Sequence, residues 1–176
     1  KLSKDSGKEY DKRFNNWDIN LSDEEILIIH QSKGIIGLNL DQRILCGQAM
    51  VDFMERTASR FRDAYNYSLL YRSVWAQPIL ENIYHILHTV FKSSNTDKEF
   101  AFEMICVGSD YDGMINALDA FCYVEDFASL REILRLKMVE RAKIDPILPS
   151  DRIDEFLDGF FYKNLIKFYE RTSKIC

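Results

Sequence analysis

The sequence lacks the features that would point to a nucleic-acid or membrane partner. Its 23 Lys and Arg are outnumbered by 28 Asp and Glu, giving a net charge of −5. A nucleic-acid-binding domain normally concentrates basic residues on one face, so we expect neither nucleic acid nor an anionic membrane surface as a partner. No apolar run approaches the roughly 18–20 residues that span a bilayer, and we therefore expect a soluble protein. The chain begins at Lys1 with no apolar signal core, so its localisation is unknown, and a processed or trimmed chain is indicated.

Cysteine is also scarce and is not paired in the sequence. The four cysteines are Cys46, Cys106, Cys122 and Cys176, and no two of them form a Cys-x-x-Cys pair. This spacing argues against a structural zinc site and indicates no disulfide framework. Cys106 lies inside an apolar run, so we expect it to be a small buried hydrophobic residue.

What is present is an ordinary globular composition, 47% hydrophobic over 176 residues, enough for about one domain. Residues 1–20 are polar and predict a loop. Ser22-Asp23-Glu24-Glu25 is a capping box that predicts a helix start, and Gly34 predicts the end of that helix. The apolar run that follows predicts a first buried strand over 34–40, of the kind found in parallel sheets.

Further helices and a second strand are predicted downstream. A helical pattern starts at Val51 and is expected to reach about Phe61, and Pro78 suits the first turn of the next helix. Residues 102–108 predict the second strand. A helix is expected over 130–139, and residues 151–169 predict one or two closing helices.

Two strands separated by about 60 helix-rich residues cannot close a barrel, and an eight-stranded α/β barrel needs roughly 250 residues. We therefore expect a helix-rich α/β chain that is the C-terminal part of a (β/α)8 TIM-type barrel, with the rest of the barrel as its partner. The alternative is an unfamiliar helical fold.

Ligands of parallel α/β folds collect where strands end at their carboxyl side. Two segments meet this description: Asn39 to Arg43 after the first predicted strand, and Ser109 to Gly113 after the second. An Asp at the exit of a buried strand is costly unless it binds a metal, orients water or is well hydrogen-bonded. The plainer alternative is that Asp110 or Asp112 only caps a loop.

Residues 108–113, Gly-Ser-Asp-Tyr-Asp-Gly, resemble the Gly-x-Asp-Phe-Asp-Gly motif of the membrane (renal) dipeptidase family, in the amidohydrolase superfamily of metal-dependent barrel hydrolases. Residues 20–25 are similar to that family's Arg-Asn-Leu-Ser-Asp-Glu-Glu helix start, and residues 34–37 then resemble its seventh barrel strand. Residues 161–168 are similar to its closing Gly-Asn-x-x-Arg helix. The three motifs occur in the family's order. Related amidohydrolases, including decarboxylases, share Gly-Ser-Asp, and the Tyr-Asp-Gly continuation favours the dipeptidase-like branch.

The resemblance implies a hydrolase that cleaves an amide or related bond in a small-molecule or peptide-like substrate through metal-activated water. It implies a divalent metal, zinc, which is binuclear in full-length members, and often a homodimer. Asp110 matches the Asp that contacts the metal-bound water and acts as general base. Asp112 and Gly113 match the rest of the turn, which shapes the substrate pocket. Asn39 and Arg43 are candidate substrate-binding residues at the exit of the first strand, and an ordinary solvated or ion-paired role is the alternative for Arg43.

The departures from the family concern the substrate carboxylate and the metal. Ile19 replaces the family's carboxylate-binding Arg, and the His-x-Asp pair, bridging Glu and later His ligands belong to strands before Lys1. His85 and His88 share a helix face expected to lie outside the barrel, and His30 suits a helix end. No metal ligand set can therefore be assembled from this chain alone. A catalytically inactive binding or structural protein of the same ancestry, or a helical interaction module, are the alternative functions.

Overall fold

The computed structural model describes residues 13–15, 17–60, 69–113 and 116–173, so most of the loop expected over 1–20 lies outside the described residues. In chain order the elements before the second strand are α1 (Asp23–Gln31), β1 (Ile36–Leu38), α2 (Gln42–Leu45), α3 (Gln48–Ser59), α4 (Leu69–Trp75), α5 (Gln77–Lys92) and α6 (Lys98–Glu103). The remaining ones are β2 (Ile105–Val107), η1 (Val124–Asp126), α7 (Phe127–Ala142), η2 (Ser150–Arg152), α8 (Ile153–Asp158), η3 (Gly159–Lys163) and α9 (Asn164–Thr172).

Helix α1 begins at the predicted capping box. The Ser22 hydroxyl accepts from the Glu25 N–H at 3.2 Å, and the Glu25 carboxylate accepts from the Ser22 N–H at 2.6 Å. The prediction of this helix start is therefore confirmed. The predicted end is late, because α1 stops at Gln31 and the left-handed residue after it is Lys33, with φ 56°, rather than Gly34.

Strands β1 and β2 run parallel, with Ile36 opposite Ile105 and Leu38 opposite Val107. Both are shorter than the predicted strands over 34–40 and 102–108. The second prediction was wrong at its start, since Phe102 lies in α6. The Asp97 carboxylate accepts from the N–H groups of Glu99 and Phe100, and this N-cap makes the residues before β2 helical. The first strand ends at Leu38 because the chain then turns into α2.

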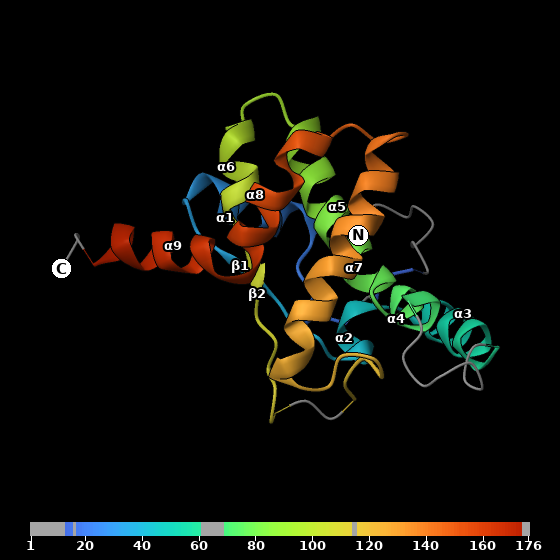
Figure 1. The fold of residues 1–176 in the computed structure, drawn as a ribbon. Coiled ribbons are helices and arrows are strands. Elements are labelled where there is room, and N and C mark those ends of the chain that lie inside the picture. Colours follow the sequence, from blue (N-terminus) through green and yellow to red (C-terminus); the bar gives the residue numbers. More distant parts are fainter. Residues whose placement is uncertain (1–12, 16, 61–68, 114–115, 174–176) are drawn as a thin grey trace.

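Helix α5 runs through the centre of the fold, and α1, α2, α6 and α7 pack against it (Figure 1). Pro78 lies in its first turn, as predicted. The apolar side chains that repeat along one face are buried: Ile79, Ile83, Ile86, Leu87 and Val90. Burial of each such side chain contributes about 1.5–3 kcal/mol. The helix predicted from Val51 is α3, which starts three residues earlier and ends at Ser59.

The C-terminal segment is divided into α8, the π-helical turn η3 and α9, where one or two helices were predicted. The side-chain amide of Asn164, which is 2% exposed, donates to the carbonyls of Phe102 and Ile105, both at 2.9 Å. This contact joins the start of α9 to the outer edge of β2. Beyond it, α9 extends away from the rest of the fold (Figure 1).

The described residues thus form a helix-rich α/β structure with one sheet of two parallel strands. The connection between the strands consists of helices α2 to α6, as expected for a parallel pair. Cys106 is buried, as predicted, and this burial raises the pKa of its thiol to about 11. Within the described part of the chain, no helix is both long enough and apolar enough to cross a bilayer.

Candidate functional site

The carboxyl ends of β1 and β2 bring Asn39 and Asp110 together. The Asn39 side-chain amide donates to the Asp110 carboxylate at 3.3 Å, and its side-chain oxygen accepts from the Asp41 N–H at 2.6 Å. Both polar atoms of the Asn39 amide are therefore hydrogen-bonded, the oxygen within its own turn and the nitrogen to the turn after β2. Two of the residues predicted as a site from separate segments, 71 positions apart, are in contact.

The turn after β2 holds its two aspartates in left-handed backbone conformations. Asp110 has φ 55° and Asp112 has φ 70°, and both side chains are exposed. Asp tolerates this region better than most residues, but each instance still costs about 1–2 kcal/mol. Strained backbone of this kind concentrates at functional sites. The turn thus presents two carboxylates to solvent at the edge where ligands of α/β folds bind.

The lack of a side chain at Gly113 determines where the Asp110 carboxylate can lie. A Cβ atom at Gly113 would lie 2.5 Å from the Asp110 side-chain oxygen Oδ1, well inside van der Waals contact. The Gly113 N–H also donates to the Asp110 carbonyl at 3.0 Å. The absence of a side chain at Gly113 therefore allows the carboxylate to fold back over the turn.

Tyr111, between the two aspartates, anchors the turn to the core. Its ring packs against Phe127, with ring centroids 5.3 Å apart. Its hydroxyl is buried and has no hydrogen-bond partner among the described residues. Burial, with smaller contributions from the charges of Asp126 and Cys122, raises the pKa of Tyr111 above its usual value. This aromatic contact holds the turn while leaving the neighbouring carboxylates outside.

Arg43 forms an ion pair, the role considered above as the alternative to substrate binding. Its guanidinium donates to both carboxylate oxygens of Asp41, at 3.0 and 2.8 Å. The Asp41 carboxylate also accepts from the main-chain N–H groups of Arg43 and Asn116, at 2.9 and 3.1 Å. Asp41 is 2% exposed. Burial alone would favour its neutral form, but these hydrogen bonds hold the pKa of Asp41 below its usual value.

The histidines lie away from this site. His30 contacts the Asp97 carbonyl, His85 the Asp23 carboxylate and His88 the Asp145 carboxylate, each at 2.8 Å. Over residues 13–173, apart from the undescribed positions, no group of three or more His, Cys, Asp or Glu side chains could hold a metal ion. The described residues therefore do not fit a complete zinc site, and Asp110 is the carboxylate that the family motif would offer to one.

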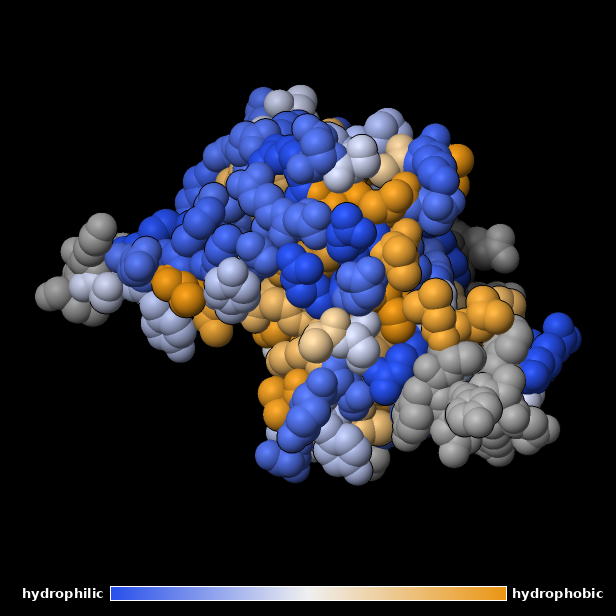
Figure 2. All heavy atoms as spheres, viewed as in Figure 1, coloured by the Kyte–Doolittle hydropathy of each residue, from blue (hydrophilic) through white to orange (hydrophobic). Residues whose placement is uncertain are grey.

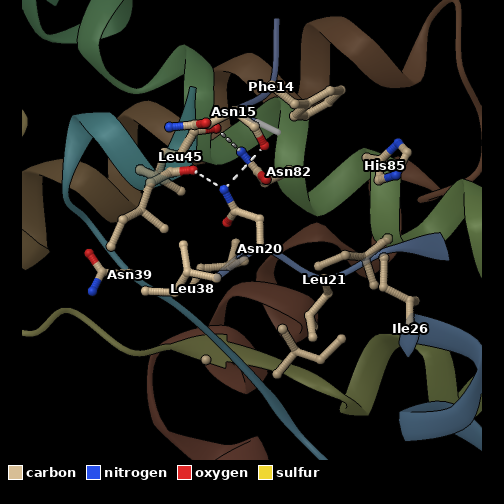
Figure 3. A pocket seen from close by; sticks show the side chains of 15 residues that line it. Phe14, Asn15, Asn20, Leu21, Ile26, Leu38, Asn39, Leu45, Asn82 and His85 are labelled. Carbon is tan, nitrogen blue, oxygen red and sulfur yellow. Dashed lines mark hydrogen bonds between the residues drawn. The ribbon is translucent and has the colours of Figure 1, made fainter. Parts of the chain in front are cut away.

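A cavity of about 270 Å³ lies along the outer side of β1 (Figure 3). It reaches from Asn39 to α1 and α5, and its wall combines apolar side chains such as Leu21 and Ile26 with amides. The Asn20 amide donates to the carbonyls of Asn15 and Ile44, at 3.2 and 2.8 Å. These bonds close one wall of the cavity and attach the segment before α1 to the end of α2.

Sequence reasoning missed three residues that build this region: Asp41, Asn82 and Asn164. Asp41 had a local signal, because an Asp directly before a short apolar helix is a common N-cap. Asn82, whose amide donates to the carbonyls of Leu45 and Pro78 at 2.8 Å, has no signal beyond a polar residue within an apolar helix pattern. Asn164 was noted only as part of the closing-helix motif, with no indication of its partners.

Comparisons with protein-family models, with curated proteins and with solved structures found no match to this chain. The likeness to the dipeptidase family therefore rests on the quoted motifs, and any function rests on the geometry of the site.

Proposed function

We propose that this chain is the C-terminal part of a metal-dependent amidohydrolase of the dipeptidase type, which cleaves an amide or related bond. The observation that carries the proposal is the Asp110 carboxylate, which follows the carboxyl end of β2 and is contacted by Asn39 from the turn after β1. In this proposal Asp110 is the general base that accepts a proton from the attacking water. General-base catalysis by a positioned side chain contributes about 10²–10⁴-fold to a rate.

The open edge of β1 supports a larger sheet. The Ile36 N–H donates to Met104 and the Leu38 carbonyl accepts from Gly108, so the N–H and carbonyl of Gly37 point away from β2. Among the described residues no third strand pairs with this edge. Two-stranded sheets are marginal alone, and proteins normally cover a strand edge. A preceding strand of a (β/α)8 barrel would occupy this place.

Exposed apolar side chains on α9 support further protein packing in the same way. Three apolar side chains of this short helix are exposed: Leu165 at 40%, Ile166 at 52% and Tyr169 at 64%. Contiguous exposed apolar surface usually marks contact with other protein. The rest of the barrel, or the second subunit of a homodimer, would cover it.

The metal in this proposal, zinc by resemblance, would be held by ligands from outside the described residues. Asp110 would add one carboxylate beside them. A divalent ion bound by such ligands would supply a bound water with a pKa of about 7. The chain's own contribution is to hold the Asp110 carboxylate at the strand end, through Asn39 and the folded turn at Gly113.

The substrate in this proposal is a small or peptide-like amide, and the chain lacks the cation that binds a substrate carboxylate in the dipeptidases. Ile19, at the position of the family's Arg, is apolar and 66% exposed. Arg43 is held by Asp41. Neither residue supplies a free cation to the site, so a preference for substrates without a free carboxylate beside the scissile bond is expected.

The test is hydrolysis by the complete protein, supplied with Zn²⁺, over a panel of dipeptides and N-acyl amino acid amides. Asp110→Asn is expected to lower kcat at least about 100-fold, because Asn keeps the left-handed backbone and the contact to Asn39 but cannot accept the proton. Asp112→Asn is the matched variant, in the same turn and with the same backbone region. It is expected to change KM more than kcat.

Equal kcat values for wild type and Asp110→Asn would contradict the role of Asp110. No hydrolysis of any substrate by metal-loaded complete protein would favour a non-catalytic binding or structural protein, which the apolar Ile19 also favours. A monomeric 176-residue chain that unfolds cooperatively without further chain would favour a helical interaction module.

A further inference from the structure

A second, separate hollow lies between α4, α5 and α7. It has a volume of about 440 Å³ and a mostly apolar wall, to which Leu69, Leu70, Leu80, Ile133, Leu136 and Ile144 contribute. Figure 2 shows apolar side chains gathered over α4 and α7 on this face. No residue of the 108–113 turn lines this groove. It is therefore independent of the proposed hydrolase site.

One amine lies in this groove. Lys137, on α7, donates from Nζ to the Ser73 hydroxyl of α4 at 3.2 Å. Within the described part of the chain, no carboxylate lies within ion-pair distance of it. Lys33, Lys143, Lys163 and Lys167, by contrast, each hold a carboxylate at 2.7–2.8 Å. Lys137 is thus held by a neutral partner in apolar surroundings.

The charged side chains that line the groove are paired with other residues, so they do not restore the pKa of the Lys137 amine. Glu140 is paired with Lys143, and Arg141 is paired with Glu81 and Asp145. Gln77 of α5 and Ser73 of α4 are neutral. Burial lowers the pKa of the Lys137 amine, and the more distant negative charge of Glu81 opposes this only in part. A lysine desolvated in an apolar pocket is an activated nucleophile, because more of it is unprotonated at neutral pH.

We propose that Lys137 is a reactive amine that captures apolar aldehydes as imines. The Nζ lone pair adds to the aldehyde carbon, and proton transfer gives a carbinolamine. Loss of the former carbonyl oxygen as water then leaves the C=N bond. The overall step converts one amine and one aldehyde into one imine and one water, with no oxidant or reductant.

The groove determines the class of aldehyde. Leu80 and Ile133 are buried beside it and offer an apolar wall to an alkyl chain. The Ser73 hydroxyl lies within hydrogen-bond distance of Nζ, where it can accept a proton from the amine and return one to the departing oxygen. An aldehyde with an alkyl chain of several carbons would bind more tightly than acetaldehyde, by up to about fourfold for each buried CH₂.

The experiment is competitive labelling of the complete wild-type protein with hexanal at pH 7.4. Borohydride reduction then fixes any imine, and peptide mapping by mass spectrometry measures modification at each lysine. Lys143 is the internal reference, because its side chain is 63% exposed and paired with Glu140. Lys137 is expected to be labelled at least about threefold faster than Lys143, because burial lowers the pKa of its amine and leaves more of it unprotonated at pH 7.4. Hexanal should exceed acetaldehyde at Lys137 but not at Lys143.

Labelling of Lys137 no faster than Lys143 would overturn the proposal, as would equal labelling by the two aldehydes at Lys137. Both comparisons use wild-type protein, so they do not depend on whether a variant folds. Ser73→Ala is expected to slow capture at Lys137 several-fold and to leave Lys143 unchanged. An unchanged rate at Lys137 in Ser73→Ala would remove Ser73 from the proposed step.

Discussion

Asp41 and Asp110 lie in the two turns that leave the sheet, and their carboxylates have opposite environments. Asp41, after β1, is buried and accepts hydrogen bonds from the Arg43 side chain and from two main-chain N–H groups. Asp110, after β2, is exposed and has one side-chain contact, a 3.3 Å bond from Asn39. The chain thus satisfies one of these acids fully and leaves the other accessible.

This difference separates a structural acid from a candidate catalytic one. The carboxylate of Asp41 caps α2 and ties it to Asn116, so its bonds are needed to hold the fold. Asp110 adds strain, through its left-handed backbone, and few contacts. A residue that contributes little to stability yet is kept in a strained position is a candidate for function. Stability and activity should therefore respond in opposite ways to changes at the two positions.

The largest expected effect on stability comes from Asp41→Ala. This change leaves the Asn116 N–H and the N-terminus of α2 without their side-chain acceptor and removes the partner of Arg43. Hydrogen bonds to a charged group contribute about 1.5–3 kcal/mol, and partial exposure of Arg43 screens the pair. We expect a loss of about 2–4 kcal/mol in the free energy of unfolding, measured by urea denaturation.

Asp110→Asn is the control for Asp41→Ala. It changes an exposed group and keeps a residue that tolerates the left-handed region, so its free energy of unfolding should stay within about 0.5 kcal/mol of wild type. Equal losses in the two variants would contradict the division between the acids.

The next largest effect on stability is expected from a substitution at Gly108, compared with one at Gly113 at the other end of the turn after β2. A Cβ at Gly108 would lie 3.1 Å from main-chain atoms of Gly37 in the neighbouring strand. A Cβ at Gly113 would instead clash with the Asp110 side chain, 2.5 Å away, and meet the Asp110 carbonyl at an ordinary 3.5 Å. Strands in a packed sheet do not separate easily, so Gly108→Ala should lower stability by about 1–3 kcal/mol. Gly113→Ala should cost less than about 1 kcal/mol but displace the carboxylate. The same urea denaturation, with hydrolysis assays on the complete protein, distinguishes these outcomes.

Asp41 should also contribute to the pH dependence of the free energy of unfolding. Its pKa is lower in the folded chain than in the unfolded one, where it is about 3.9. Its contribution is therefore present above about pH 4 and is lost as the pH falls through the lower folded value. The stability difference between wild type and Asp41→Asn should be constant from pH 7 to 5 and shrink below pH 4. A difference that grows with acid would contradict this sign.

The sequence predicted local features of the fold better than contacts between distant segments. The capping box at Ser22 and the place of Pro78 in the first turn of α5 follow from residues within one helix, and both were confirmed. The start of β2 was predicted too early, because apolar residues in α6 and in a buried strand look alike without the Asp97 cap. The likeness to a TIM barrel stays a prediction, since two strands are compatible with it and do not establish it.

The candidate site was predicted only in part, for the same reason. Strand ends indicated Asn39 and Asp110, and these two are in contact. The sequence did not show that Asp41 would be buried, because its partner Asn116 is 75 residues away. Side-chain bonds to the main chain of remote segments leave no periodic pattern. The structural role of Asp41 could therefore be found only from the folded chain.

The last variant, Asn39→Ala, removes the link between the two turns. Its bond to Asp110 is long and exposed, whereas its bond from the Asp41 N–H is part-buried. We expect a loss of no more than about 1 kcal/mol in the free energy of unfolding. If Asn39 orients Asp110 for catalysis, kcat of the complete protein should fall about tenfold with little change in KM. Asn39→Asp, which keeps the acceptor for Asp41 but places a negative charge beside Asp110, should retain stability and lose activity. A variant pair that loses stability and activity in the same proportion would instead make Asn39 a purely structural residue.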